Sequence, residues 1–119
     1  MRSDRRGPSV NVWYHVRDLD AARAFYRDKL GFTETFVDGD GEWSQLERNG
    51  MEIGLAKGEP QEDGAVAHVD VDDVKAASEQ LRAAGVEIGI VFELHGQMRL
   101  LDVFDPDGNR LQFAQELST

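Results

Sequence analysis

The sequence predicts an α+β fold made of two tandem βαβββ modules. Strand-like and helix-like periodicities occur in the order strand, helix, three strands, and that order then occurs a second time. Identical letters recur at a spacing of 55 residues, which indicates an internal duplication. Turn sequences rich in glycine, asparagine and aspartate separate the short strands, as is typical of hairpins.

These features divide the chain into one domain and a short tail. Residues 1–8 carry three arginines with no apolar stretch after them, so we expect a flexible basic tail and not a secretory signal. A single domain is expected over residues 9–117, with module one at 9–57, a polar linker at 58–64 and module two at 65–117. A module of this size has little core alone, so the modules are expected to pair, within one chain or between chains.

The first module begins with a strand at 10–16, where apolar and polar side chains alternate. Residues 20–32 have the apolar spacing of an amphipathic helix closed by Gly31, and Asp18 or Asp20 can cap its first turn. Three short strands, FTETFVD, EWSQLER and MEIGLAK, follow. Their separators, GDG and NG, predict tight hairpin turns.

The second module repeats this order. AVAHVDV is predicted as a strand, DDVKAASEQLRAAG as a helix that ends at Gly85, and VEIGIVFE, QMRLLDVF and NRLQFAQ as three further strands. The turn DPDG introduces the last strand, since proline presets one φ and glycine accepts a positive φ. The identical pairs between the modules are Val16 and Val71, Asp18 and Asp73, Ala21 and Ala76, Ala22 and Ala77, and Arg27 and Arg82.

Composition argues against several functional classes. The formal net charge is −10, whereas a general nucleic-acid-binding protein needs a basic surface, so no nucleic-acid partner is expected. The chain contains no cysteine, which excludes disulfides, thiol catalysis and cysteine-ligated zinc. No apolar run approaches the roughly 20 residues that span a bilayer, so we expect no membrane partner and a cytoplasmic location.

Strand parity predicts that each sheet has a helix-covered apolar face and a second, mixed face. The second face carries Trp13, His15 and His68, where an open solvated sheet would usually carry Lys, Glu, Thr and Arg. Aromatic and polar side chains together are typical of a concave ligand site, and the alternative is packing at a module or subunit interface. Glu47 is added as a candidate cavity base, with solvent exposure as its alternative. The candidate ligand-binding residues are Asn11, Trp13, His15, Glu47, Val66, His68, Asp70, Arg110 and Gln112.

The segments VWYHVRDLDAARAFYRDKLGF and DVFDPDGNRLQFAQ resemble the vicinal oxygen chelate superfamily. That superfamily includes glyoxalase I, extradiol dioxygenases, and the fosfomycin-resistance and bleomycin-resistance proteins. The resemblance covers residues 9–116, nearly the whole chain. It implies that the eight strands of the two modules form a U-shaped, mixed-sheet cup, which a homodimer commonly completes.

The resemblance also identifies four positions at which the family binds a divalent metal. The ligands come from the first and last strands of each module, and the metal stabilises negative charge on neighbouring substrate oxygens. Carried over by motif, these positions fall on Asn11, Gly54, Val66 and Gln112. Gly54 and Val66 have no coordinating side chain, and the neutral Asn and Gln amides are weak ligands. The resemblance therefore predicts no metal at the usual site, as in bleomycin-resistance-type members, which sequester a ligand.

The leading hypothesis is a metal-free protein that binds a small molecule in the cup, sequestering an antibiotic or metabolite, and forms a homodimer. One alternative is a lyase, isomerase or dioxygenase-like enzyme that uses a non-standard metal site or a His/Glu acid–base pair. Such a shifted divalent-metal site would use His15 and His68, joined by Asp70 or Glu47. Another alternative is a structural or regulatory dimer whose cup is closed by side chains.

Overall fold

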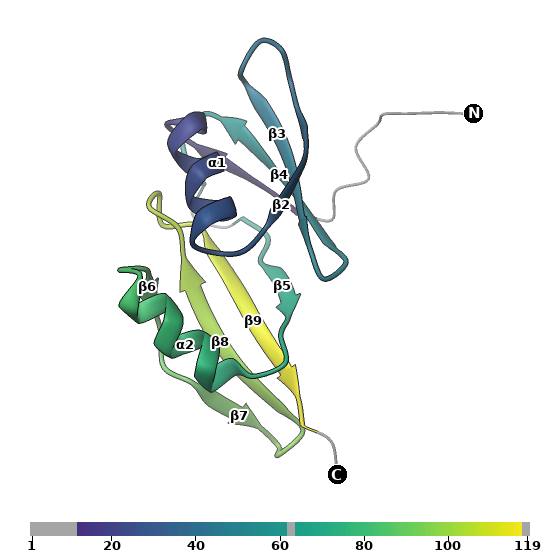
Figure 1. Cartoon of the computed structure of the whole chain (residues 1–119), viewed down its shortest axis with the longest axis vertical. Helices are drawn as coiled ribbons and strands as arrows, with labels where there is room; N and C mark the ends of the chain where they lie inside the picture. Colours follow the sequence, from purple (N-terminus) through teal and green to yellow (C-terminus); the bar gives the residue numbers. More distant parts are fainter. Residues whose placement is uncertain (1–11, 62–63, 118–119) are drawn as a thin grey trace, which may run out of the picture.

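The computed structural model describes residues 12–61 and 64–117, and their elements follow the predicted order (Figure 1). The predicted tail at 1–8 and the candidate Asn11 lie outside the described residues. Module one contains β1 (Val12–Val16), α1 (Leu19–Asp28), β2 (Thr33–Val37), β3 (Trp43–Arg48) and β4 (Met51–Lys57). Module two contains β5 (Ala67–Asp70), α2 (Val74–Ala83), β6 (Glu87–Ile88), β7 (Phe92–Leu94), β8 (Met98–Phe104) and β9 (Arg110–Glu116).

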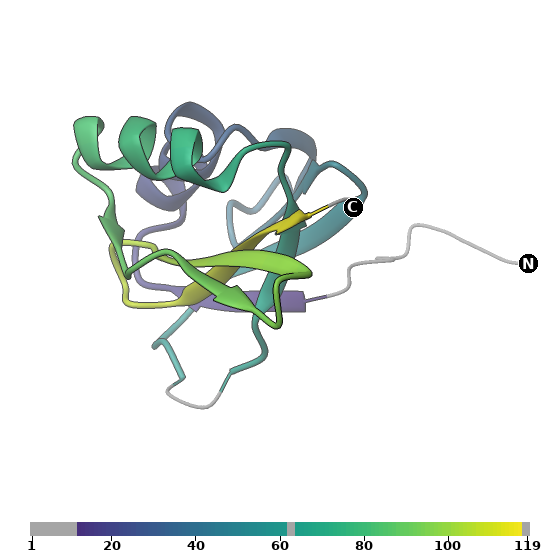
Figure 2. The same ribbon diagram turned by 90° about the horizontal axis from the view of Figure 1, so that it is seen from below.

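Each module builds its own mixed sheet, which confirms the α+β fold with two βαβββ modules. The strand order is β1-β4-β3-β2 in the first sheet and β5-β9-β8-β6 in the second, where β7 also pairs with β8. In each module the first strand lies parallel to the last strand, so the intervening helix can cross over one face. Both helices consequently lie on the same side of the two sheets (Figure 2).

One predicted strand, VEIGIVFE, is divided into the two short strands β6 and β7. Ile88 pairs with Val103 and Phe92 pairs with Leu100, so this strand has one residue more than β8 over the same stretch. An extra residue on one strand interrupts the ladder and bends the chain, as a β-bulge does. Ile90, which lies within the interruption, is 81% exposed.

The two helices begin at equivalent aspartates of the duplicated sequence. The Asp18 carboxylate accepts a hydrogen bond from the Ala21 backbone N–H at 3.1 Å, and Asp73 accepts one from Ala76 at 3.0 Å. Asp18, and not Asp20, is therefore the cap of α1. Such caps satisfy backbone donors that have no partner within the helix.

The core lies between the helices and the facing side of each sheet. In β1, Val12, Tyr14 and Val16 are buried, whereas Trp13 is 56% exposed, as strand parity predicts. The same alternation occurs in β5, where Val69 is buried and its neighbours His68 and Asp70 are exposed. We call the sheet faces that turn away from the helices the outer faces.

The two modules contact each other within this chain through several hydrogen bonds. The Tyr26 hydroxyl on α1 donates to the Asp105 carboxylate at 2.7 Å. The Tyr14 hydroxyl on β1 donates to the Arg110 backbone oxygen at 2.6 Å and accepts from the Ala67 N–H at 2.9 Å. These bonds join the first module to the starts of β5 and β9.

Several hydrogen bonds converge on Asp105 at the boundary between the two modules, which we call the module seam. Its carboxylate accepts hydrogen bonds from the backbone N–H groups of Asp107 and Asn109 and from the Asn109 side chain, all at 2.9 Å, as well as from Tyr26. Burial nevertheless raises the pKa of Asp105, because desolvation opposes the charged form more strongly than these bonds favour it. Burial also raises the pKa of Tyr14 to about 12. The turn DPDG, which leads into β9, therefore also contributes to the contact between the modules.

Within residues 12–61 and 64–117, no helix is long and apolar enough to cross a membrane.

Candidate functional site

An aromatic cluster occupies the outer face of the first sheet. The rings of Trp13 on β1 and Trp43 on β3 meet edge to face, with centroids 5.2 Å apart and an interplanar angle of 73°. The His15 ring lies beside Trp13 at a centroid distance of 5.8 Å. We call Trp13, His15 and Trp43 the aromatic cluster. With Trp13 half exposed, it offers a flat apolar surface that a planar molecule can stack on.

Gly54 on β4 makes this arrangement possible. A Cβ at this position would overlap the six-membered ring of Trp43, with Cζ2 only 2.8 Å away, so the indole lies directly against the glycine backbone. The Trp43 indole N–H donates to the Gln45 side-chain oxygen at 3.2 Å, which fixes the ring. The Trp43 ring therefore covers the position to which the resemblance assigns a first-module metal ligand.

A polar cluster occupies the outer face of the second sheet. The Asp102 carboxylate on β8 accepts hydrogen bonds from Arg110 Nη1 at 3.3 Å and from Gln112 Nε2 at 3.2 Å. Gln112 on β9 also lies opposite His68 in the parallel β5–β9 pair. We call His68, Asp102, Arg110 and Gln112 the polar cluster. Three of its four residues belong to the predicted site.

The two clusters lie on adjoining sheets and on the same side of the molecule. Tyr14, between Trp13 and His15 in β1, bonds to the beginnings of β5 and β9, as described above. The Asn109 side chain adds a hydrogen bond to the His15 backbone oxygen at 3.0 Å. Because both helices cover the opposite side, the outer faces of both sheets turn away from them together (Figure 2).

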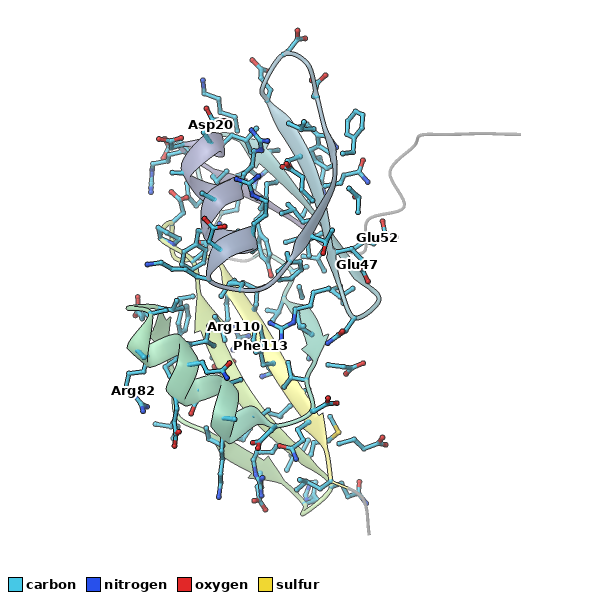
Figure 3. The ribbon with its side chains drawn as sticks, viewed as in Figure 1. Asp20, Glu47, Glu52, Arg82, Arg110 and Phe113 are labelled. Carbon is cyan, nitrogen blue, oxygen red and sulfur yellow. The ribbon has the colours of Figure 1, made fainter. Side chains whose placement is uncertain are left out.

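Other predicted residues are engaged elsewhere. The Glu47 carboxylate accepts a hydrogen bond from the Gly50 N–H at 2.7 Å, so it holds the β3–β4 turn, where it is the cross-strand neighbour of Glu52 (Figure 3). The exposed Asp70 lines a separate cavity of about 560 Å³ together with two further acidic residues, Asp72 and Glu116.

Val66 lies at the seam between the modules. It lines a cavity of about 110 Å³ that Tyr14 and Arg110 also line. The structure thus brings Trp13 and His15 together and brings His68, Arg110 and Gln112 together. Val66 shares the seam cavity with Arg110, whereas Glu47 and Asp70 are engaged at the β3–β4 turn and at a separate cavity.

The side chains that could bind a metal ion are scattered over the described part of the chain. Within residues 12–61 and 64–117, no three His, Asp or Glu side chains are grouped closely enough to hold a metal ion. The donor set at the family's usual positions is equally poor: Gly54 lies under an indole, and the Gln112 amide donates to Asp102. The residues present at this site do not fit a transition metal.

Two members of these clusters, Trp43 and Asp102, were missing from the sequence prediction. Trp43 has a signal in hindsight, because an aromatic side chain often packs over a glycine on a neighbouring strand. Asp102 is the one acidic residue of MRLLDVF, and a carboxylate in a mid-sheet strand is a sign of a specific partner. Neither signal could be used from the sequence alone, because both depend on which strands are neighbours in the sheets.

Comparisons with known proteins agree on the fold. A family model described as the Glyoxalase/Bleomycin resistance protein/Dioxygenase superfamily matches residues 10–113. An integron cassette protein from the mobile metagenome of the Halifax Harbour sewage outfall superposes with a TM-score of 0.78, at 21% identity, covering 92% of this chain and 99% of that one. A comparison with curated protein sequences gave no match.

Two further similar structures have names that refer to a ligand or an activity. The bleomycin-binding protein of bleomycin-producing Streptomyces verticillus, complexed with copper(II)-bleomycin, has a TM-score of 0.70 and 23% identity, covering 95% of this chain and 98% of that one. Lactoylglutathione lyase from Agrobacterium tumefaciens has a TM-score of 0.67 and 20% identity, covering 92% and 96%. At such identities the likeness establishes the fold.

Proposed function

Since this chain belongs to the Glyoxalase/Bleomycin resistance protein/Dioxygenase superfamily, we propose that it binds a small planar molecule on the outer faces of its two sheets without a metal at the family's usual site. The observation that carries the proposal is the Trp43 ring lying on Gly54, beside the half-exposed Trp13. At the first-module position where the family has a metal ligand, this chain has Gly54 covered by the Trp43 ring.

The aromatic cluster favours an apolar or aromatic ligand part. Large aromatic side chains provide much contact area at low entropic cost, and edge-to-face pairs of this kind hold each other in place. Trp13 leaves more than half of its surface in water, 56%, which a stacked ligand would cover. The aromatic cluster therefore offers exposed contact area and rings with fixed positions, and a stacked ligand needs both.

The polar cluster would orient the ligand's hydrogen-bonding groups. Asp102 already holds Arg110 and the Gln112 amide nitrogen, so these side chains have fixed positions. The Gln112 amide oxygen, for which the described residues offer no donor, is then available to accept a hydrogen bond. A chain of net charge −10 also attracts cations, so a planar ligand that carries N–H donors or positive charge is favoured.

A second candidate function, an enzyme of the lyase, isomerase or dioxygenase kind, is favoured by one observation. His68 lies directly beside Gln112 on the outer face, and His15 lies on the outer face of the adjoining sheet. Two imidazoles on one side of the molecule could serve as acid and base, or as ligands of a shifted metal. Stoichiometric zinc, nickel, manganese or iron in untagged protein, lost in His68→Ala, would favour this candidate over the metal-free binder.

We also propose that two copies associate through their outer faces and enclose the ligand. Exposed apolar side chains lie on these faces, namely Phe36 opposite Gln45, and Phe92 and Leu94 on β7. Exposed apolar groups of this size are typical of interaction surfaces. Sedimentation of a monomer at micromolar concentration would contradict the dimer. A cytoplasmic location stays a prediction.

Ligand binding can be tested by tryptophan fluorescence and thermal shift, with metal-free bleomycin as the first probe and a panel of planar cationic antibiotics after it. We expect a probe to quench fluorescence and raise the melting temperature of the wild type. Trp13→Ala should weaken binding by about tenfold or more, as loss of an aromatic anchor does. The matched control is Ile90→Ala, an exposed apolar residue outside both clusters.

Two results would contradict the proposed ligand site on the outer faces. If no probe in the panel changes either signal, or if Trp13→Ala and Ile90→Ala bind equally well, the outer faces are not the ligand site. The other hypothesis from the sequence, a structural or regulatory dimer whose cup is closed by side chains, would then be favoured.

A further inference from the structure

A cleft of about 290 Å³ lies on the opposite side of the molecule, between the C-terminal end of α1 and the side of α2. Arg48 of module one and Phe113 of module two line it, so it follows the seam between the modules. Figure 3 shows Phe113 where the two modules meet. Leu81 and Ala77 of α2 form an apolar wall. We call this cavity the seam cleft.

Arg48 brings a positive charge into the seam cleft without a carboxylate to balance it. Its guanidinium carbon lies 5.1 Å from the centre of the Phe113 ring, and its Nη1 donates to the Leu30 backbone oxygen at 2.6 Å. Among the described residues, no Asp or Glu oxygen lies within ion-pair distance of it. Desolvation by burial lowers the pKa of Arg48, as expected for a cation without an opposite charge beside it.

Among the seven arginines of the described residues, only Arg48 and the exposed Arg82 have no carboxylate partner, and of these two only Arg48 is half-buried. Acidic residues outnumber basic ones by 23 to 13, and arginines 17, 23, 27, 99 and 110 each pair with a carboxylate. A half-buried charge costs free energy unless something compensates it. The ring face of Phe113 and one backbone oxygen compensate only in part.

The Arg48 guanidinium still has N–H donors that could bind an anion. A guanidinium has five N–H donors in a planar fork, of which the Leu30 bond uses one. Lys29, at the rim of the seam cleft, adds a second cation, with its ammonium held 2.9 Å from the Ala84 backbone oxygen. Asp28 also lines the rim, so the lining side chains carry one net positive charge. Gly31 leaves space beside the fork, since a Cβ there would lie 3.2 Å from Nη1.

We propose that the seam cleft binds a small carboxylate that has an apolar body. The carboxylate would pair with the free edge of the Arg48 fork, and the body would lie along α2 beside Ala77 and the stem of Gln80, because Leu81 and Phe113 behind them are already buried. The volume is near the lower limit of small-molecule clefts, about 300 Å³, which suits a molecule of roughly the size of benzoate. The inference does not rest on the proposed function, because this site lies on the helix side of the sheets.

Titration of ¹⁵N-labelled full-length protein with sodium benzoate tests the inference, at ionic strength held constant with sodium chloride. We expect saturable shifts of the Gly31 and Ala77 amides, with a dissociation constant on the order of 1 mM. Benzamide, the neutral counterpart of benzoate, should cause no such shifts, because only the carboxylate pairs with the fork. This comparison uses the wild type and is independent of any effect of substitution on folding.

Substitution gives the second test. Arg48→Met keeps an apolar stem against Phe113 and removes the charge, so benzoate affinity should fall by about tenfold or more. Arg82→Met removes an exposed arginine of α2 that points away from the seam, and should leave affinity unchanged (Figure 3). Trp13→Ala should also leave it unchanged, which separates this site from the outer faces. Equal shifts with benzamide, shifts that do not saturate, or full affinity in folded Arg48→Met would each overturn the inference.

Discussion

The hydrogen bond between Tyr26 and Asp105 holds the two modules together, so its removal by Tyr26→Phe tests the intramolecular seam. The Tyr26 side chain is fully buried, and its hydroxyl lies 2.7 Å from the Asp105 carboxylate. Phenylalanine fills almost the same volume, so the loss is mainly one hydrogen bond to a charged group, about 1.5–3 kcal/mol. That is a large fraction of the roughly 5–15 kcal/mol by which domains are stable.

Urea unfolding at 25 °C, followed by tryptophan fluorescence, measures this loss. With a slope of about 1–3 kcal/mol per molar urea, the midpoint should fall by roughly 1 M. The matched control is Tyr14→Phe, which removes hydrogen bonds to uncharged backbone groups at the same seam. Its cost should be about 1 kcal/mol per bond.

The dependence on pH distinguishes the two variants. The pKa of Asp105 is raised by burial, and the Tyr26 hydroxyl works against that rise by favouring the carboxylate. In Tyr26→Phe the pKa of Asp105 therefore rises further, so the cost is largest where Asp105 is ionised and shrinks as acid protonates it. The Tyr14→Phe cost should stay constant. A Tyr26→Phe midpoint within 0.2 M of wild type, or a cost that does not shrink with acid, would refute this account of the seam.

Three other predictions concern stability and the aromatic cluster. The Arg23 guanidinium, helped by Ser44 and Arg27, lowers the pKa of Glu34 from 4.5 to about 2. Stability present above pH 4.5 should therefore be lost towards pH 2, by about 1–2 kcal/mol after solvent screening, and Arg23→Met should reduce this dependence in urea titrations. Gly54→Ala should displace the Trp43 ring at a cost of about 1–3 kcal/mol and change the near-ultraviolet circular dichroism; an unchanged spectrum would contradict the contact. Leu101→Ala, at a fully buried position, should cost about 2–5 kcal/mol in calorimetry, and an unchanged melting temperature would show that the core is misassigned.

The sequence by itself determined the elements and the faces of the strands. The repeated module order and the outward-facing Trp13 and His68 depend on periodicities of two and 3.6 residues. Such features are local, so they can be inferred before any long-range contact is known. The sequence left Asp18 and Asp20 as alternative caps of the first helix, and the structure selects Asp18. The division of one predicted strand into β6 and β7 was not predicted, because the extra residue appears only when that strand is paired with β8.

Only the tertiary structure decided which of these faces and side chains meet. Asp102 joins Gln112 because β8 and β9 are neighbours in register, and Trp43 covers Gly54 because β3 lies beside β4. Likewise, Arg48 and Phe113 are 65 residues apart in sequence and meet because the modules pack within one chain. Pairing of distant segments depends on burial and on hydrogen bonds summed over the whole core, and no local pattern in the sequence specifies it.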